Sequence, residues 1–345
     1  MIKALTVGAA AWLLGSTAFA QPPTPSPPAP TGIVVGSGNF FSPIVANLDR
    51  ALAFYRDGLG LDVAGPPGNA DTNPALRNMF GLPDAQLRWT IGRPPGMGSG
   101  VEMVEIGKAG GKPVERRIQD TGAFSLIVLV RDLDAILARV KQTGAPIVSA
   151  AGAPVKFSFG NGKSRGIVVK DPDGHFVELF QFDPLPETTA PASSNVIGVR
   201  VRLTVDDAAA AMRLYRDALG LKQTSLDEFK SDPNVSAMFG LPGGEFRLGT
   251  AAVPGTGLIV EFIEYRGVDH RRVASDLRDP GSTRIQLQVR DVDEAVRELK
   301  SAGGVVISTG GAPVELPRTG GPPIKVAIVR DPNNLFVVLL QAARP

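Results

Sequence analysis

The phrase VVKDPDGHFVELFQ, at residues 168–181, returns as IVRDPNNLFVVLLQ at residues 328–341. The offset between the two is 160 residues, and other phrases recur at 159 or 160 residues. They are AFYRDGLGL (53–61) with RLYRDALGL (213–221), MFGLP (79–83) with MFGLP (238–242), and VRDLDAILARVKQTGAPIV (130–148) with VRDVDEAVRELKSAGGVVI (289–307). One structural unit has therefore been duplicated with almost no insertion or deletion.

Each copy also repeats one order of elements within itself. Apolar alternation predicts a strand at 39–46, helical spacing predicts a helix at 48–60, and short strands follow near 61–64, 86–92 and 101–106. The order then returns as a strand at 124–130, a helix at 132–144, and strands at 146–149, 165–170 and 175–181. Each copy thus contains two βαβββ modules, which gives four modules in all and an α+β fold.

Two phrases of the first copy carry a resemblance to a known family. LDRALAFYRD (48–57) and DPDGHFVEL (171–179) occur in the expected order, and the pattern resembles the vicinal oxygen chelate superfamily. This group includes glyoxalase I, bleomycin-resistance proteins, fosfomycin-resistance enzymes and extradiol dioxygenases. The resemblance implies tandem cup-shaped domains over 33–183 and 196–342, joined by a Pro/Thr/Ser-rich linker at 184–195. It implies no single reaction, because the chemistries of the superfamily differ widely.

The resemblance also implies up to four ligand positions in each cup, on the first and last strands of its modules. In the first copy these positions hold Phe40, Glu102, Ser125 and Glu178. Phe40 and Ser125 stand where the family most often has histidine or glutamine, so the two glutamates remain. If Glu102 and Glu178 face one cup, their ionisations are coupled. They would then act as a general acid/base pair or as ligands of a weakly bound divalent metal. The alternative is a remnant satisfied by Arg88 or water.

The same positions in the second copy hold Arg200, Glu261, Arg284 and Val338. Two cations and one carboxylate do not make a divalent-metal site. We expect Arg200, Glu261 and Arg284 to cluster on one concave face. Such a cluster would either bind a carboxylate or phosphate, or form an internal Arg–Glu–Arg group that fills a closed cup.

The remaining candidates are apolar residues and the two histidines of the chain. Phe40, Val104, Ile127 and Phe180 are predicted to point into the first cup, which suits an aromatic or alkyl ligand. Strand alternation places His175 on the face opposite Glu178, so we expect it at the turn or rim and outside any metal site. His270 lies in a loop without ligand companions. Since the chain has no histidine besides these two, a site with two histidines and a carboxylate within one cup is excluded unless loops reorganise.

The ends and the composition of the chain limit the setting. Residues 1–20 combine Lys3, a short apolar run and AFA (18–20), which predicts a signal peptide cleaved after Ala20 and a periplasmic or secreted protein. A proline-rich tether follows at 21–32. The chain contains no cysteine, which excludes disulfides, thiolate nucleophiles and cysteine-metal sites. A net charge of +2 without a basic stripe predicts no nucleic-acid partner, and no membrane contact is expected after cleavage.

Three functions fit these features. The first is an exported protein that binds a small organic molecule in a cup without a complete metal site. The second is a lyase, isomerase or dioxygenase-type enzyme that uses Glu102 and Glu178, with or without a divalent metal. The third is a non-catalytic scaffold whose closed cups support a surface for another protein. The sequence leaves the three open, together with the ligand and the oligomeric state.

Overall fold

The computed structural model describes residues 32–157, 164–318 and 321–341. The predicted leader and residues 21–31 of the predicted tether lie outside the described residues. Within the described ranges, no helix is long and apolar enough to cross a membrane.

The four predicted modules are present, preceded by β1 (Val34–Ser37). Module 1 contains β2 (Ser42–Val45), α1 (Leu48–Leu52), a π-helical turn (Ala53–Gly58), β3 (Asp62–Val63), α2 (Pro74–Phe80), β4 (Gln86–Arg93) and β5 (Val101–Gly107). Module 2 contains β6 (Phe124–Val130), α3 (Leu133–Gln142), β7 (Val155–Phe157), β8 (Ser164–Lys170) and β9 (Phe176–Gln181). Module 3 contains β10 (Val196–Thr204), α4 (Ala208–Leu219), β11 (Lys222–Leu226), α5 (Pro233–Phe239), β12 (Glu245–Ala252) and β13 (Ile259–Arg266). Module 4 contains β14 (Thr283–Val289), α6 (Val292–Ser301), β15 (Val305–Val306), a 3₁₀ turn (Thr309–Gly311), β16 (Val314–Arg318), β17 (Gly321–Arg330) and β18 (Phe336–Gln341).

Local signals explain where the short helices α2 and α5 begin and end. A proline occupies the first turn of each, and the preceding Asn73 or Asp232 accepts a hydrogen bond from a backbone N–H of that turn. Each helix ends at the glycine of an MFGLP phrase, with Gly81 at φ 67° and Gly240 at φ 68°. A side chain at Gly81 would also meet the carbonyl oxygen of Ile307 at 2.3 Å, so this glycine is required by conformation and by space.

The strands pair across the two sequence copies. One sheet runs β11-β12-β13-β10-β6-β9-β8-β7 and joins modules 2 and 3, and the other runs β15-β17-β18-β14-β2-β5-β4-β3 and joins modules 1 and 4. The antiparallel pairing of β6 with β10 is the seam of the first sheet, and β2 with β14 is the seam of the second. We call the two halves cup 2/3 and cup 1/4. The expectation that each copy closes its own cup is therefore wrong. The first strands of all four modules are alike, so the repeat could not show which of them pair.

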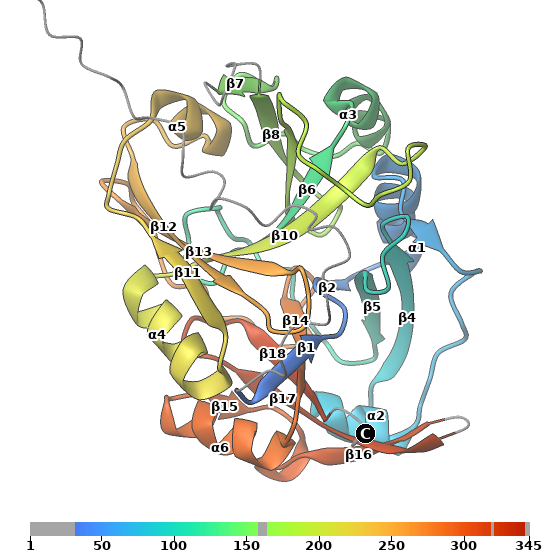
Figure 1. Cartoon of the computed structure of the whole chain (residues 1–345). Helices are drawn as coiled ribbons and strands as arrows, with labels where there is room; N and C mark the ends of the chain where they lie inside the picture. The colour runs from blue at the N-terminus through green and yellow to red at the C-terminus, as the bar shows by residue number, and fades with distance from the viewer. Residues whose placement is uncertain (1–31, 158–163, 319–320, 342–345) are drawn as a thin grey trace, which may run out of the picture.

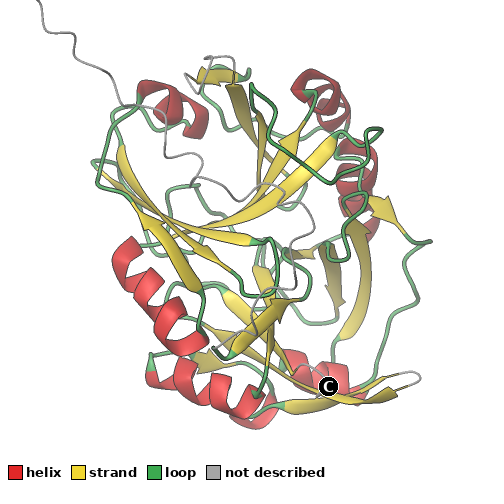
Figure 2. Cartoon of the chain, in the orientation of Figure 1, coloured by secondary structure: helices red, strands yellow, loops and turns green. Residues whose placement is uncertain are grey.

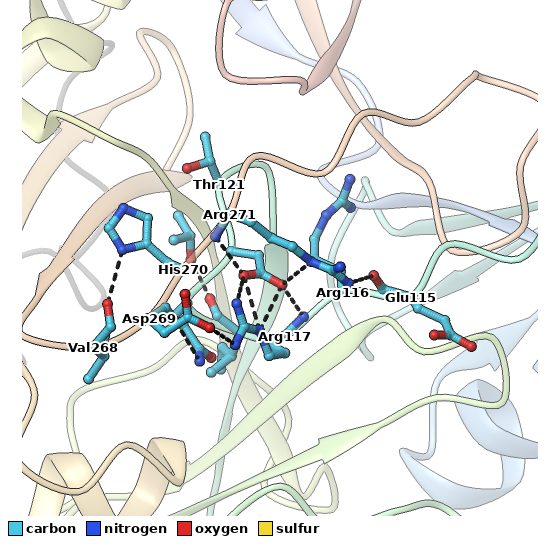
Figure 3. Close-up of polar contacts among 12 residues, drawn as sticks. Glu115, Arg116, Arg117, Thr121, Val268, Asp269, His270 and Arg271 are labelled. Carbon is cyan, nitrogen blue, oxygen red and sulfur yellow. Dashed lines mark hydrogen bonds and ion pairs between the residues drawn. The ribbon is translucent and has the colours of Figure 1, made fainter.

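Two crossing segments, 108–123 and 267–282, carry the chain between the cups and contact each other. Buried Asp120 accepts hydrogen bonds from the side chain of Arg117 and from the backbone N–H of Arg271, at 2.8 and 3.0 Å. Asp279 accepts the backbone N–H of Lys112 at 2.9 Å, which is the equivalent contact with the copies reversed. In Figure 3, Arg117 also reaches Asp269, which is an ion pair of 2.8 Å. These contacts between the two copies stabilise the pairing of module 1 with module 4 and of module 2 with module 3.

The four longer helical segments, in contrast, pair within each copy, whereas the short helices α2 and α5 pack against strands of the other copy. α3 packs against the π-helical turn of module 1, and α4 packs against α6. Figure 1 shows α4 and α6 side by side at the lower left, and Figure 2 shows these helices lying outside the strands. One large apolar cluster includes residues of all four of these modules and both sheets. The two copies therefore share their sheets while each keeps its own helix pair.

The two phrases that carried the family resemblance meet inside each copy. The hydroxyl of Tyr55 donates to Asp171 at 3.0 Å in the first copy, and Tyr215 donates to Asp331 at 2.9 Å in the second. Both aspartates also accept backbone N–H groups of their own turns. Each contact anchors the first helix of a copy to the turn before its last strand, which explains why both phrases recur together.

His175 extends this network in the first copy only, because Leu335 takes its position in the second. Its Nδ1 lies 2.8 Å from a carboxylate oxygen of Asp171 and its Nε2 lies 3.0 Å from the carbonyl oxygen of Ser282. Both partners are acceptors, so both ring nitrogens donate and the imidazole is charged. Burial alone would lower the pKa of His175, but the charge of Asp171 outweighs it and raises the pKa above its usual value. His175 lies at the predicted turn and outside the cups, but it is buried and not at a rim.

We predict that His175→Leu lowers the free energy of unfolding by about 3 kcal/mol at pH 6, because it removes one partner of a buried charge pair. The folded-state pKa of His175 is raised, so its stabilisation is complete below the unfolded-state pKa of about 6.5 and is lost as pH rises through the folded-state pKa. Asp171, Asp173 and Tyr55 are the titratable groups around it. Urea unfolding of wild type and variant between pH 5 and pH 9 measures the difference, which should shrink as pH rises.

The control is His270→Leu, because His270 is exposed and its Nδ1 lies 3.2 Å from the carbonyl oxygen of Val268, with no charged partner among the described residues. This variant should unfold like the wild type at every pH. A destabilisation by His175→Leu that stays constant with pH would contradict the charged state of the ring.

Candidate functional site

The seam of cup 2/3 gathers four charged side chains. Arg202 on β10 donates to Glu261 on β13 through Nε at 2.9 Å and Nη2 at 2.6 Å, and its Nη1 donates to Glu178 on β9. Arg200 donates to the other oxygen of Glu261 at 3.0 Å. All four side chains are at most 4% exposed. The guanidinium of Arg202 therefore lies between two buried carboxylates that come from different modules.

Burial and charge divide the ionisation of this cluster unevenly. Burial and the charge of Glu261 raise the pKa of Glu178 to about 7, against the opposing effect of Arg202. Burial would also raise the pKa of Glu261, but Arg202 and Arg200 outweigh it and hold the pKa below its usual value. Glu261 is thus the firmly charged partner of both arginines. Glu178 is the carboxyl that takes up a proton first as pH falls.

The seam of cup 1/4 holds a smaller polar cluster around Glu102 on β5. Arg284 and Gln286, both on β14, donate to the same oxygen of Glu102 at 3.1 and 2.7 Å. Gln286 also lies 3.3 Å from the hydroxyl of Ser42 on β2, and its carbonyl accepts the backbone N–H of Asn39. Burial raises the pKa of Glu102 despite Arg284, and burial lowers the pKa of Arg284 despite Glu102.

These clusters correct two sequence-based predictions. Glu102 and Glu178 do not share a cup, because their strands β5 and β9 belong to different sheets. Arg200, Glu261 and Arg284 do not form one cluster either, since Arg284 lies in cup 1/4 with Glu102. Both predictions assumed that each copy builds its own cup, whereas module 2 pairs with module 3 and module 1 pairs with module 4. We call this pairing the exchange of modules between copies.

The predicted inward positions on the first strands of modules 1 and 3 were also two residues too early. Arg202 lies opposite Ser125 across the β6–β10 seam, and Ser42 lies opposite Arg284 across the β2–β14 seam. Phe40 packs instead in the apolar cluster between sheets and helices. Arg202, Ser42 and Gln286 were therefore missed. Strand alternation makes Arg202 and Ser42 candidates as well, because they follow Arg200 and Phe40 at i+2, but it does not choose between the two registers.

The other predicted residues divide between the two cups. Ile127 and Phe180 belong to the inner apolar cluster of cup 2/3, where Phe180 stacks on Phe182 at 5.8 Å. Val104 and Val338 belong to the inner cluster of cup 1/4. Arg88, suggested as the partner of the glutamates, pairs with Glu105 at 3.3 Å.

The MFGLP phrases cover the buried arginines. Phe239, at the end of α5, lies over the guanidinium of Arg202 at 5.4 Å from its ring centroid, and Phe80, at the end of α2, lies over Arg284 at 4.8 Å. The carbonyl of Met238 accepts the hydroxyl of Ser149 at 2.7 Å, and that of Met79 accepts Ser308 at 2.9 Å. Each phrase thus binds the other copy through its methionine carbonyl and places an aromatic face on the arginine of one cup.

Comparison with known proteins agrees with this architecture. The model of the Glyoxalase/Bleomycin resistance protein/Dioxygenase superfamily matches residues 39–179 and again 199–338. The chain belongs to this superfamily. Glyoxalase I from Zea mays has a similar fold, with 18% identity and a TM-score of 0.53 over 88% of this chain and 92% of that one. A putative dioxygenase from Bacillus subtilis subsp. subtilis str. 168 has 12% identity and a TM-score of 0.50 over 90% and 86%. No curated protein matches the sequence.

The superfamily resemblance implied metal ligands at the seams, and the side chains present do not fit a divalent cation. In cup 2/3 the guanidinium of Arg202 already contacts both carboxylates, and in cup 1/4 Arg284 contacts the single carboxylate. Among the described residues, no group of three or more His, Cys, Asp or Glu side chains could hold a metal ion. At each seam a buried arginine therefore neutralises the carboxylates in the place where a metal ion would do so.

The two superfamily cups differ in access to solvent. Several aromatic residues of cup 2/3 are replaced by smaller residues at the equivalent positions of cup 1/4. Phe180 corresponds to Leu340, Tyr265 to Ile106 and Phe246 to Leu87. Conversely, Leu248 of cup 2/3 is buried, whereas its counterpart Trp89 is 38% exposed. The side chain of Glu102 is 18% exposed, while that of Glu178 is fully buried. Cup 1/4 is thus the cup whose polar cluster reaches the surface.

Proposed function

We propose that the protein binds a small organic molecule in cup 1/4, with an oxygen acceptor of the ligand at Arg284. The observation that carries the proposal is the Nε–H of Arg284, which is buried and has no hydrogen-bond partner among the described residues. The side chain is only 1% exposed, so an unmet donor there is costly unless a ligand or water accepts from it. A carbonyl or carboxylate oxygen of the ligand would supply that acceptor.

The apolar part of the ligand would lie against the wall formed by Trp89, Ile91 and Leu340. Trp89 and Ile91 are opposite Val104 and Glu102 on the paired strands β4 and β5, so all four share the inner face of the sheet. Leu340 is partly buried against the same apolar cluster. An exposed tryptophan on the same sheet face as a carboxyl that pairs with a buried arginine suits an aromatic or alkyl molecule with one polar end.

A second candidate function is proton transfer by Glu102, as in a lyase or isomerase. The raised pKa and partial exposure of Glu102 favour it, because a general base needs a pKa near the working pH and contact with substrate. Glu178, the partner suggested by the sequence, is buried in the other cup and would take no part.

We also propose that the protein is exported with cleavage after Ala20, which the leader pattern of residues 1–20 supports. The mass of the exported protein should correspond to a chain that begins at Gln21. Retention of Met1 would refute this proposal.

Binding is tested with the fluorescence of Trp89, because Trp12 lies in the leader and a chain that begins at Gln21 has no other tryptophan. Benzoate, benzaldehyde and hexanoate are suitable probes. We expect at least one to change the Trp89 emission saturably, and Arg284→Met to weaken its affinity about tenfold or more, since a hydrogen bond to a charged group contributes about 1.5–3 kcal/mol. Glu102→Gln should leave binding within a few fold and abolish any turnover that the probe undergoes.

The matched control is Arg290→Met, the same substitution at an exposed arginine just beyond β14. It should bind the probe like the wild type. The proposal fails if no probe alters the Trp89 emission, or if Arg284→Met and Arg290→Met bind equally well while both remain folded by circular dichroism.

A further inference from the structure

Cup 2/3 contains a charge arrangement that its closed apolar interior does not explain. Glu178 and Glu261 stand at equivalent positions on the last strands of modules 2 and 3, and neither is more than 2% exposed. The β6–β10 seam brings them to the same place, because Ser125 lies opposite Arg202 there and Arg202 lies beside Glu261 on the parallel neighbour. Two carboxylates buried at a module junction both stay ionised only when a cation lies between them.

Arg202 is that cation, and its contacts are divided between the modules. It donates twice to Glu261 of its own module, at 2.6 and 2.9 Å, and once to Glu178 of the neighbouring module. The two carboxylates raise the pKa of Arg202 above its usual value even though burial opposes this. Phe239 covers one face of the guanidinium. A single cation thus joins carboxylates of two modules.

Cup 1/4 lacks the second carboxylate, because Val338 occupies the position equivalent to Glu178. Its arginine, Arg284, therefore contacts one glutamate and stands on the other side of the seam. The pair of carboxylates with a bridging cation is specific to cup 2/3 in the described structure, so the two cups need separate explanations.

We propose that Arg202 replaces a divalent metal ion in cup 2/3, as a permanent internal cation that fastens module 2 to module 3. The site beneath it is a latent divalent-cation site made of the Glu178 and Glu261 carboxylates. Removing the guanidinium while supplying a neutral ligand at residue 202 uncovers that site. The proposal is independent of ligand binding in cup 1/4.

The test is Arg202→His, probed with Mn²⁺ alone by calorimetric titration and by thermal unfolding. Histidine is a neutral nitrogen ligand that, with two carboxylates, forms a donor set suited to Mn²⁺. We expect the variant to bind one Mn²⁺ per chain and its midpoint of unfolding to rise with Mn²⁺ concentration. The wild type should show neither effect. Arg202→His combined with Glu261→Gln should lose the acquired binding.

Two further variants serve as controls. Arg200→Gln removes the neighbouring arginine and leaves Arg202 between the carboxylates, so it should not respond to Mn²⁺. Arg202→Lys retains a cation at the same position and should behave likewise. The proposal is overturned if Arg202→His folds and ignores Mn²⁺, if it stays unfolded at every Mn²⁺ concentration, or if the wild type binds Mn²⁺ in a way that Glu261→Gln abolishes.

Discussion

The antiparallel pairing of β6 with β10 determines which charged side chains of this protein meet. It places Ser125 opposite Arg202 and brings the last strands β9 and β13 to either side of the seam, where Glu178 and Glu261 share one guanidinium. The equivalent pairing of β2 with β14 leaves Glu102 with Arg284. Had each copy closed its own cup, Glu102 and Glu178 would have faced each other without a buried cation from β10. The exchange of modules thus determines which buried carboxylates meet which arginines, in addition to the order of the strands.

The same duplication has produced two cups with different properties. Cup 2/3 has balanced buried charges and an interior filled by phenylalanine and tyrosine, which stabilise a closed junction. Cup 1/4 has smaller inner residues, an exposed Trp89 and a partly exposed Glu102. A protein with two equivalent units can retain one as a structural junction while the other keeps a surface-accessible polar cluster.

The sequence was sufficient for the four modules and their superfamily, because apolar periodicity and the repeat are local properties of the chain. It was insufficient for the pairing of modules, since β2, β6, β10 and β14 offer equivalent edges. That choice depends on the crossing segments, where Asp120 accepts from Arg271 and Asp279 accepts from Lys112. Neither contact lies in a repeated phrase that could be recognised beforehand. The site residues followed the pairing, so Glu102 and Glu178 were assigned to one cup although their strands lie in two.

Residue register was the second limit of the sequence. A strand pattern identifies the faces of a strand but not how far it slides, so Arg200 and Phe40 were chosen where Arg202 and Ser42 meet the seam. His175 shows the same limit in another form. Its position after a turn was readable, whereas its two acceptor partners, Asp171 and the carbonyl of Ser282, come from different copies.

Methyl–methyl nuclear Overhauser contacts in deuterated, methyl-labelled protein test the exchanged pairing most directly. The account predicts contacts between Leu126 and Val201 and between Val128 and Val199, which lie opposite each other on β6 and β10. All four side chains are buried, so their methyl groups are held in place. A spectrum in which β6 has no contact with β10 and pairs along its length with β2 would contradict the central claim.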